Sequence, residues 1–460
     1  MNFQPVDNIL ITSSDHTPNT IQCISKSSFD DAFVALTTTQ QQWVTNQDFK
    51  GKSNTLIRIP GDSSDAIWLG VGEADSVSIR NASAWASQQL PAGLYKYDDD
   101  FCQFEQAYGW ALGQYEFDRY LEKKHVPNRL VISDEAMNEL GNIINGLFLT
   151  RDLINTPTND MGPEQLAEVA KELAIEYGAN FSQVLDEELL DKGYRTIYAV
   201  GMAAENRPRL IELTWGNEDA PAVTLVGKGV CFDSGGLDIK PASSMRIMKK
   251  DMGGGAHTLG LASMIMANNL NVNLRVLVPA VENSISDNAF RPGDIIKTYK
   301  GTTVEIDNTD AEGRLILCDA LALACEQPPE LLIDFATLTG AARVAMGPDV
   351  VPYFTDDKKL AAELYQHSEK CHDPMWPMPL YKGYEKDLKS PVADMSNMGK
   401  GPFGGAITAG LFLKHFVDES VSWVHFDLYG WNSSKKPTCP EGGQSMAIHG
   451  VYNLLSDRYK

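Results

Sequence analysis

Two acids and an arginine lie within five residues of one another in the segment 308–314, which reads Asn-Thr-Asp-Ala-Glu-Gly-Arg. Asp310 and Glu312 offer the hard oxygen ligands that divalent cations prefer. Arg314 follows at the start of a helical pattern, where free backbone N–H groups favour an anion. For this segment alone, a metal site and a helix cap with a surface ion pair are about equally good interpretations.

The sequence around this segment predicts a turn from a strand into a helix. The run 302–306 is rich in β-branched residues, as is typical of a strand. Gly313 gives the turn backbone freedom. Leucines at helical spacing follow, at positions 315, 317, 321 and 323.

A second polar cluster lies upstream, where a predicted buried strand ends. The segment 226–241 is dense in glycine and carries two lysines and two aspartates, and the segment 249–256 follows it closely. A glycine-rich loop after a buried strand is where the backbone approaches something closely. Of the eight histidines, only His257 lies near these residues. The acids therefore favour an oxygen-ligated metal site over the alternative of a tight loop with surface lysines.

Together these stretches resemble the leucyl aminopeptidase family, also called cytosol aminopeptidases, which are two-metal exopeptidases. The resemblance covers the second half of the chain, and Asn-Thr-Pro at 155–157 fits the family's domain junction. The motifs that carry it are VGKG (226–229), FDSGGLDIKP (232–241), KKDMGGGA (249–256), RPGD (291–294), NTDAEGRLIL (308–317), ATLTGA (336–341) and ADMSN (393–397). These matches are long, ordered and specific.

The resemblance implies two divalent metal ions, which we expect to be Mn²⁺, Zn²⁺ or Mg²⁺. The positions that match the family's metal ligands are Lys228, Asp233, Asp251, Asp310 and Glu312. Asp233 and Glu312 match the acids that touch both ions. Asp251 and Lys228 match ligands of one ion only, and Asp310 matches a ligand of the other. Because a lysine ligates only as the free amine, we expect the two cations to lower the pKa of Lys228 strongly.

Lys240 and Arg314 match the family's two catalytic residues. A charged Lys240 can stabilise the oxyanion of a tetrahedral intermediate. The resemblance also implies a carbonate or bicarbonate ion beside Arg314, acting as the general base. Arg314 would hold this anion by a bidentate contact at the N-terminus of a helix. The paired ions would share a water, lower its pKa and polarise the scissile carbonyl.

The expected substrates are peptides with a free N-terminus, since the substrate amine would ligate one of the ions. The positions that match the family's pocket for the first side chain are Met248, Thr337 and Gly340. An apolar pocket would favour leucine-like residues. The chain departs from better-known family members at Tyr429 and Trp431, which are larger. Core packing and direct substrate contact are both open interpretations of these two side chains.

The order of apolar segments predicts an α/β protein with two domains. We expect a small N-terminal α/β domain at 1–132 for scaffolding or assembly, a linking helix at 133–154 and a catalytic domain at 155–460. Short apolar runs alternate with helical segments in the last of these. They predict a mixed, mainly parallel central sheet flanked by helices. The runs are 210–213, 223–226, 274–278, 331–335 and 421–426.

Composition narrows the functional classes further. A chain of 460 residues is longer than a single hydrophobic core usually serves, which favours two domains. The net charge of −22 opposes nonspecific binding to nucleic acid or to anionic membranes. Seven scattered cysteines with no CxxC pattern suit free thiols in a reducing compartment. Without a signal-peptide pattern or a long apolar span, we expect a cytoplasmic protein. The resemblance also implies a homohexamer.

These observations predict a metal-dependent aminopeptidase that releases N-terminal, leucine-like residues from peptides. One alternative is a family member that mainly binds or scaffolds, since some relatives also bind DNA. The complete set of matching site residues and the negative charge oppose it. The other alternative is a two-metal phosphoryl hydrolase. It lacks support from a phosphate-cradling loop or an extra cluster of arginine and lysine.

Overall fold

The chain divides into two compact units. The computed structural model describes residues 5–61, 65–98, 103–122 and 126–460. One unit comprises residues up to 148 together with 432–441, and the other comprises 149–431 and 442–460. The division falls inside helix α5 (Asp134–Asn155), which occupies the predicted linking helix.

The segment 432–441 groups with the N-terminal unit, which the predicted boundaries did not anticipate. Within that unit, the side-chain amide of Gln88 donates a 2.7 Å hydrogen bond to the carbonyl of Pro437. A contact between residues so far apart in the chain leaves no local pattern in the sequence.

A six-stranded sheet forms the centre of the described part of the N-terminal unit, in the order β1-β6-β5-β2-β4-β3. All neighbours pair in parallel except β3 and β4. The strands are β1 (Leu10–Ile11), β2 (Asn19–Ser25), β3 (Thr55–Ile59), β4 (Ala66–Gly72), β5 (Leu94–Tyr97) and β6 (Arg129–Val131). The helices are α1 (Phe29–Val34), α2 (Thr38–Asn46), α3 (Ser76–Gln89) and α4 (Gln103–Gly113).

The second unit is built on a nine-stranded sheet in the order β16-β15-β18-β14-β9-β11-β8-β7, with β10 paired to β11. The strands β18, β14, β9 and β11 are parallel to one another, whereas β8 and β15 pair antiparallel to this group. The strands are β7 (Asn180–Leu185), β8 (Arg209–Gly216), β9 (Ala222–Gly227), β10 (Gly229–Asp233), β11 (Asn273–Asn283), β14 (Leu331–Ala336), β15 (Val351–Phe354), β16 (Met375–Met378) and β18 (Ser422–Asp427). All five predicted runs are strands, and the predicted mixed, mainly parallel sheet is confirmed.

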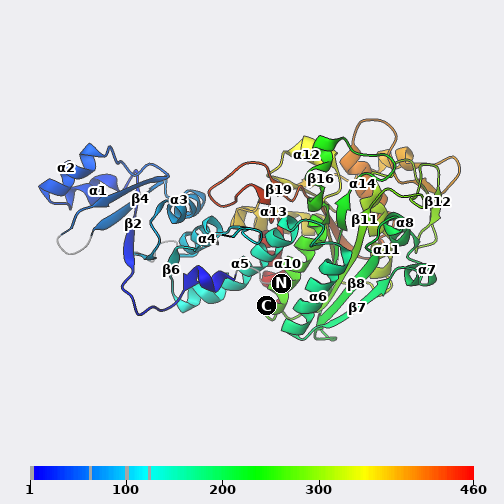
Figure 1. Ribbon diagram of the computed structural model, residues 1–460, viewed down its shortest axis with the longest axis horizontal. Coiled ribbons are helices and arrows are strands. Elements are labelled where there is room, and N and C mark those ends of the chain that lie inside the picture. The colour runs from blue at the N-terminus through cyan, green and yellow to red at the C-terminus, as the bar shows by residue number, and fades with distance from the viewer. Residues whose placement is uncertain (1–4, 62–64, 99–102, 123–125) are drawn as a thin grey trace. The chain divides into compact units, whose positions relative to one another are not determined.

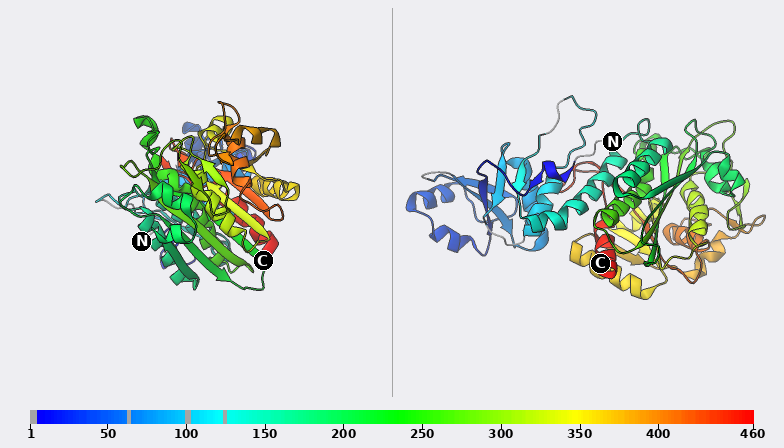
Figure 2. Two further views of the ribbon diagram at one scale, coloured as in Figure 1. Left: turned by 90° about the vertical axis from the view of Figure 1, so that its right-hand side faces the viewer. Right: turned by 90° about the horizontal axis from the view of Figure 1, so that it is seen from below.

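Helices flank this sheet on both sides (Figures 1 and 2). Helix α10, which is buried along nearly its whole length, packs on β9 and β14, and α11 packs on β9 and β11. Helix α6 begins at Pro163 and ends at Tyr177, and Gly178 follows it as a C-cap in the left-handed region, with a φ of 69°. The principal helices are α6 (Pro163–Tyr177), α7 (Glu188–Asp191), α8 (Arg195–Gly201), α10 (Gly253–Ala267), α11 (Glu312–Ala324), α12 (Gly340–Met346), α13 (Lys358–Cys371), α14 (Gly405–Lys414) and α15 (Ile448–Tyr459).

Short elements complete the second unit. A small sheet joins β12 (Ile295–Lys297), β13 (Thr303–Glu305) and β17 (Met395–Ser396), and β13 falls in the predicted strand before segment 308–314. Helix α9 (Ala242–Met245) and the 3-10 helices η2 (Met248–Met252) and η3 (Lys382–Leu388) lie in the connections. Among the residues described, no helix has the length and apolar character needed to cross a membrane.

Candidate metal centre

The candidate site gathers at the carboxyl ends of the parallel strands, where open α/β sheets collect their ligands. Lys228 directly follows β9, Asp233 ends β10 and Thr337 directly follows β14. Asp251 lies on η2, immediately before α10. Glu312 is the first residue of α11. Elements that are distant in the sequence therefore deliver their polar side chains to one edge of the sheet.

The structure brings all five predicted metal ligands together. Asp233, Asp310 and Glu312 each offer a carboxylate oxygen, and these oxygens lie within 4.8 Å of one another. The Nζ of Lys228 lies 2.7 Å from Oδ2 of Asp251 and 2.9 Å from Oε1 of Glu312. Asp310 is exposed, whereas the other four residues are at most 3% exposed.

Lys240 and Arg314, the two predicted catalytic residues, border this cluster. The Nζ of Lys240 lies 2.6 Å from Oδ2 of Asp233 and also pairs with Asp310. Arg314 is buried in the first turn of α11, and its Nη1 donates a 2.7 Å hydrogen bond to the carbonyl of Asn397. Its Nε has no hydrogen-bond acceptor in the described structure. Arg314 can therefore still offer a donor to an anion.

The carboxylates perturb one another because they are crowded and largely withdrawn from water. Burial, followed by repulsion from Asp233, raises the pKa of Glu312 to about 8. Burial, followed by repulsion from Asp251, raises the pKa of Asp233 to about 6. Burial also opposes the charge of Asp251, but Lys228, Lys250 and Lys240 together outweigh burial and lower the pKa of Asp251. An uncompensated carboxylate cluster of this kind attracts cations.

Lys228 responds in the opposite sense to the prediction made for a lysine beside two cations. Burial disfavours its charge, but Asp251 and Glu312 outweigh burial and raise its pKa. The acids of the chain alone therefore favour the ammonium form. The lowered pKa expected for a ligating amine requires the cations themselves to be beside it.

The donor set fits divalent cations. Oε2 of Glu312 is buried without a hydrogen-bond donor. Oε1 of Glu312 and Oδ2 of Asp251 lie close to Lys228, but these contacts lack hydrogen-bond geometry. Buried acids that lack donors, together with one amine, form the oxygen-rich coordination sphere that suits Mn²⁺, Mg²⁺ or Zn²⁺.

Glycine is required where α11 approaches Lys228. A Cβ on Gly313 would lie 2.4 Å from Cε and 2.7 Å from Nζ of Lys228. We expect Gly313→Ala to lower metal affinity at least about tenfold by displacing Lys228, since even indirect support of a ligand is worth this much. Alanine also favours a helix, so the fold should persist. Gly93→Ala is a matched control, because its nearest neighbour would lie at an ordinary 3.4 Å. Titration against a chelator measures the difference, and equal affinities in the two variants would contradict the expectation.

Several supporting residues were not predicted as site residues. The side chain of Asn283 at the end of β11 donates to Oδ1 of Asp233 at 2.9 Å and to the carbonyl of Thr309 at 3.1 Å. Asp427 at the end of β18 accepts from the backbone N–H groups of Leu338 and Thr339, both at 3.0 Å. A single asparagine or aspartate at a strand end carries no pattern in the sequence. Only the folded sheet places these residues beside the cluster.

Of the three residues expected to line the first-residue pocket, Met248 and Thr337 lie close to Asp251. Met248 precedes it on η2, and Gly340 begins α12. The hydroxyl of Thr337 donates a 2.9 Å hydrogen bond to Oδ1 of Asp251, so Thr337 also orients an expected metal ligand. Tyr429 is half-buried rather than enclosed in the core.

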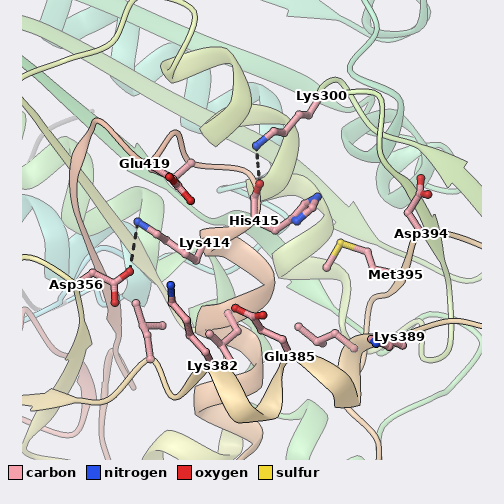
Figure 3. A pocket seen from close by; sticks show the side chains of 14 residues that line it. Lys300, Asp356, Lys382, Glu385, Lys389, Asp394, Met395, Lys414, His415 and Glu419 are labelled. Atoms are coloured by element: carbon pink, nitrogen blue, oxygen red, sulfur yellow. Dashed lines mark hydrogen bonds and ion pairs between the residues drawn. The ribbon is translucent and has the colours of Figure 1, made fainter.

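A separate cavity of about 610 Å³ lies in the same unit (Figure 3). Lys300, Asp356, Lys414 and His415 are among its lining residues. Two of its lysines are paired, because Nζ of Lys414 lies 3.5 Å from Asp356 and Nζ of Lys300 donates a 2.6 Å hydrogen bond to the carbonyl of His415. None of the carboxylates of the candidate metal centre lines this cavity. It is therefore distinct from that centre.

A mixed, mainly parallel sheet that gathers acids and lysines at its strand ends is an architecture in which α/β enzymes bind divalent metal ions. Residues 148–454 match the catalytic domain of the cytosol aminopeptidase family, and residues 19–133 match the M17 aminopeptidase N-terminal domain. The chain belongs to the cytosol aminopeptidase family. It is accordingly a metal-dependent aminopeptidase, a hydrolase that acts on peptides.

Individual relatives agree in both sequence and structure. A probable cytosol aminopeptidase of Syntrophotalea carbinolica is 41% identical over 366 residues, covering 75% of this chain and 73% of that protein. The crystal structure of cytosol aminopeptidase from Coxiella burnetii matches with a TM-score of 0.94 and 41% identity, covering 98% of this chain and 99% of that one. The bottromycin maturation enzyme BotP in complex with Mn matches with a TM-score of 0.87 and 29% identity, covering 96% of this chain and all of that one (100%).

Proposed function

We propose that the chain binds two divalent metal ions at the cluster described above and uses them to release the first residue of peptides. The observation that carries this proposal is the convergence of Asp233, Asp310 and Glu312 within 4.8 Å, with Lys228 in contact with Glu312. The proposed ligands are Lys228, Asp233, Asp251, Asp310 and Glu312. Asp233 and Glu312 would contact both ions. The manganese complex of BotP supports Mn²⁺, and the oxygen-rich donor set is also compatible with Zn²⁺ or Mg²⁺.

The chain's own catalytic groups are Lys240 and Arg314. When bound, the two ions supply the activation of water and the polarisation of the scissile carbonyl. Lys240, held beside Asp233, donates to the oxygen of that carbonyl as negative charge develops. Arg314 would hold a bicarbonate or carbonate ion, which would supply a general base beside the metal centre. Its unpartnered Nε and its position in the first turn of α11 support this role.

Substrate selection follows from the same edge of the sheet. The free amino group of the peptide would be a ligand of one ion, so a peptide with a blocked N-terminus would not bind. Met248, Thr337 and Gly340 line the pocket for the first side chain, which accepts leucine-like residues. The hydrogen bond from Thr337 to Asp251 supports a pocket that adjoins the metal centre directly.

Assembly and location are extensions of the resemblance to the family. We propose a cytoplasmic homohexamer in which residues 1–132 serve assembly, 133–154 form the linking helix and 155–460 carry catalysis. The separate sheet of the N-terminal unit and the concentration of site residues in the second unit support this division of labour.

Three substrates test the proposed activity. The metal-loaded protein should hydrolyse an unblocked leucyl anilide and should leave both the acetylated leucyl anilide and a phosphate ester intact. The leucyl anilide has a free amine, which the acetylated anilide lacks. Both anilides present an amide bond, whereas the phosphate ester presents a P–O bond. Cleavage of the acetylated anilide or of the phosphate ester, in place of the unblocked anilide, would remove the aminopeptidase assignment. Cleavage of the phosphate ester would favour a phosphoryl hydrolase.

A further inference from the structure

Lys250 carries a buried charge that the proposed mechanism does not use. It lies on η2 next to Asp251 and is 5% exposed. Its ammonium lies 5.0 Å from the ring centroid of Tyr429. No carboxylate lies within salt-bridge distance of this ammonium in the described structure, and no carbonyl there accepts a hydrogen bond from it. Contact with a ring offsets only part of the cost of burying a charge.

The close contacts of Asp251 come from side chains other than Lys250. The carboxylate of Asp251 already has the ammonium of Lys228 at 2.7 Å and the hydroxyl of Thr337 at 2.9 Å. Lys250 acts on Asp251 only through its charge at longer range. Its ammonium can therefore still form a direct contact with a group that a ligand provides.

A second cation approaches the same ring. The guanidinium carbon of Arg343 on α12 lies 4.9 Å from the ring centroid of Tyr429. Arg343 is exposed, whereas Tyr429 is half-buried. One buried and one exposed cation thus meet at a single phenol ring, which adds a hydroxyl donor of its own.

This group of three side chains adjoins the proposed pocket for the first residue. Lys250 shares η2 with Met248, and Arg343 shares α12 with Gly340. A Cβ on Gly430, the residue after Tyr429, would lie 3.4 Å from Cγ2 of Thr337. Each segment that supplies a residue of the proposed pocket therefore also supplies, or contacts, a residue next to the ring of Tyr429.

Charge balance favours an anionic occupant. The four carboxylates of the centre carry four negative charges, which two divalent ions would neutralise. The charges of Lys250 and Arg343 then remain without a carboxylate at salt-bridge distance in the described structure, and a concentration of one sign of charge attracts the opposite sign.

We propose that Lys250, Arg343 and Tyr429 form a subsite for an acidic first side chain, so that glutamyl and aspartyl peptides are substrates alongside leucyl peptides. This inference rests on the proposed aminopeptidase function and names a substrate class for the same site. The carboxylate of the substrate supplies the acceptor that the ammonium of Lys250 lacks within the chain.

The test compares kcat/KM for unblocked glutamyl and leucyl anilides. Wild type should cleave the glutamyl anilide at a rate within about tenfold of the leucyl anilide. Lys250→Met should lower the glutamyl-to-leucyl ratio about tenfold or more, since a charge-assisted hydrogen bond is lost. Arg343→Gln should lower this ratio less, because Arg343 is exposed. Lys250→Arg should retain most of it, and Lys382→Met, which removes a lysine of the separate cavity, should leave it unchanged.

Binding of the free amino acids by calorimetry provides a second measurement. Glutamate should bind the metal-loaded wild type, and Lys250→Met should weaken glutamate binding more than leucine binding.

An unchanged glutamyl-to-leucyl ratio and unchanged glutamate binding in folded Lys250→Met would overturn the subsite while leaving the aminopeptidase in place. Selective loss of cleavage of leucyl dipeptides relative to the leucyl anilide would also overturn it, because Lys250 would then bind the terminal carboxylate. Failure to cleave any unblocked anilide would count against the proposed function instead. If Lys250→Met does not fold, the glutamyl-to-leucyl ratio of kcat/KM measured for Arg343→Gln tests the subsite instead.

Discussion

Glu312→Gln should reduce kcat/KM on the leucyl anilide by on the order of 10³-fold or more, since it removes the acid proposed to contact both ions. Glutamine keeps the shape of the side chain but replaces one carboxylate oxygen with an NH₂ group, which cannot ligate a cation. Glu312 is 1% exposed and begins α11, so no neighbouring acid can take its place without moving the helix. Elemental analysis of the purified variant should find weakened retention of both ions.

The fold should survive this substitution. The carboxylate of Glu312 has no hydrogen-bond donor at Oε2, and burial raises its pKa to about 8, so its charge does not stabilise the chain by itself. Glu326→Gln is the matched control, because Glu326 is exposed just beyond the end of the same helix. It should retain full activity and metal content. Normal turnover by Glu312→Gln with both ions bound would refute the bridging role.

The parts of the fold that could be predicted from sequence are those with a local signal. Continuous apolar runs predicted β9, β11, β14 and β18, because strands buried on both faces need apolar residues throughout. The run at 210–213 also predicted β8, but its antiparallel direction was not evident, since burial does not encode strand direction. Helix α6 was marked at both ends by Pro163 and Gly178.

The site divides in the same way between local and distant features. Asp310, Glu312 and Arg314 lie in one short segment, so their proximity was evident from the sequence. The support from Asn283 and the contact of Lys250 with Tyr429 depend on how distant elements pack. Tyr429 was identified as a departure from the family pattern, but the two cations on its ring could be found only in the folded chain.

A second buried charge network lies within the sheet itself. Asp334 on β14 and His425 on β18 are fully buried, and the Nδ1 of His425 lies 2.6 Å from Oδ1 of Asp334. The indole N–H of Trp423 donates a 2.7 Å hydrogen bond to Oδ2 of the same aspartate. Burial opposes the charged form of His425, but the charge and hydrogen bond of Asp334, with a further contribution from Asp427, outweigh burial and raise the pKa of the imidazole. This pair joins the neighbouring strands β14 and β18, whose ends carry Thr337 and Asp427 toward the site.

Asp334→Asn should lower the free energy of unfolding by about 3–5 kcal/mol at pH 6, since it leaves a buried imidazolium without its partner. Because the pKa of His425 is raised in the folded state, the stabilisation by this pair is complete below the ordinary histidine value of about 6.5. It declines as the pH rises through the higher pKa of the folded protein. The cost of the substitution should therefore be smaller at pH 9 than at pH 6.

Urea unfolding of wild type and variant at both pH values measures this difference. Asp457→Asn is the control, because Asp457 is exposed and its pair with the exposed Lys370, at 3.4 Å, is of a kind that contributes at most about 1 kcal/mol. An equal cost of Asp334→Asn at pH 6 and pH 9 would mean that His425 is neutral throughout. The aspartate would then act only as a hydrogen-bond acceptor for Trp423 and a neutral imidazole, and the strands would be joined without a buried ion pair.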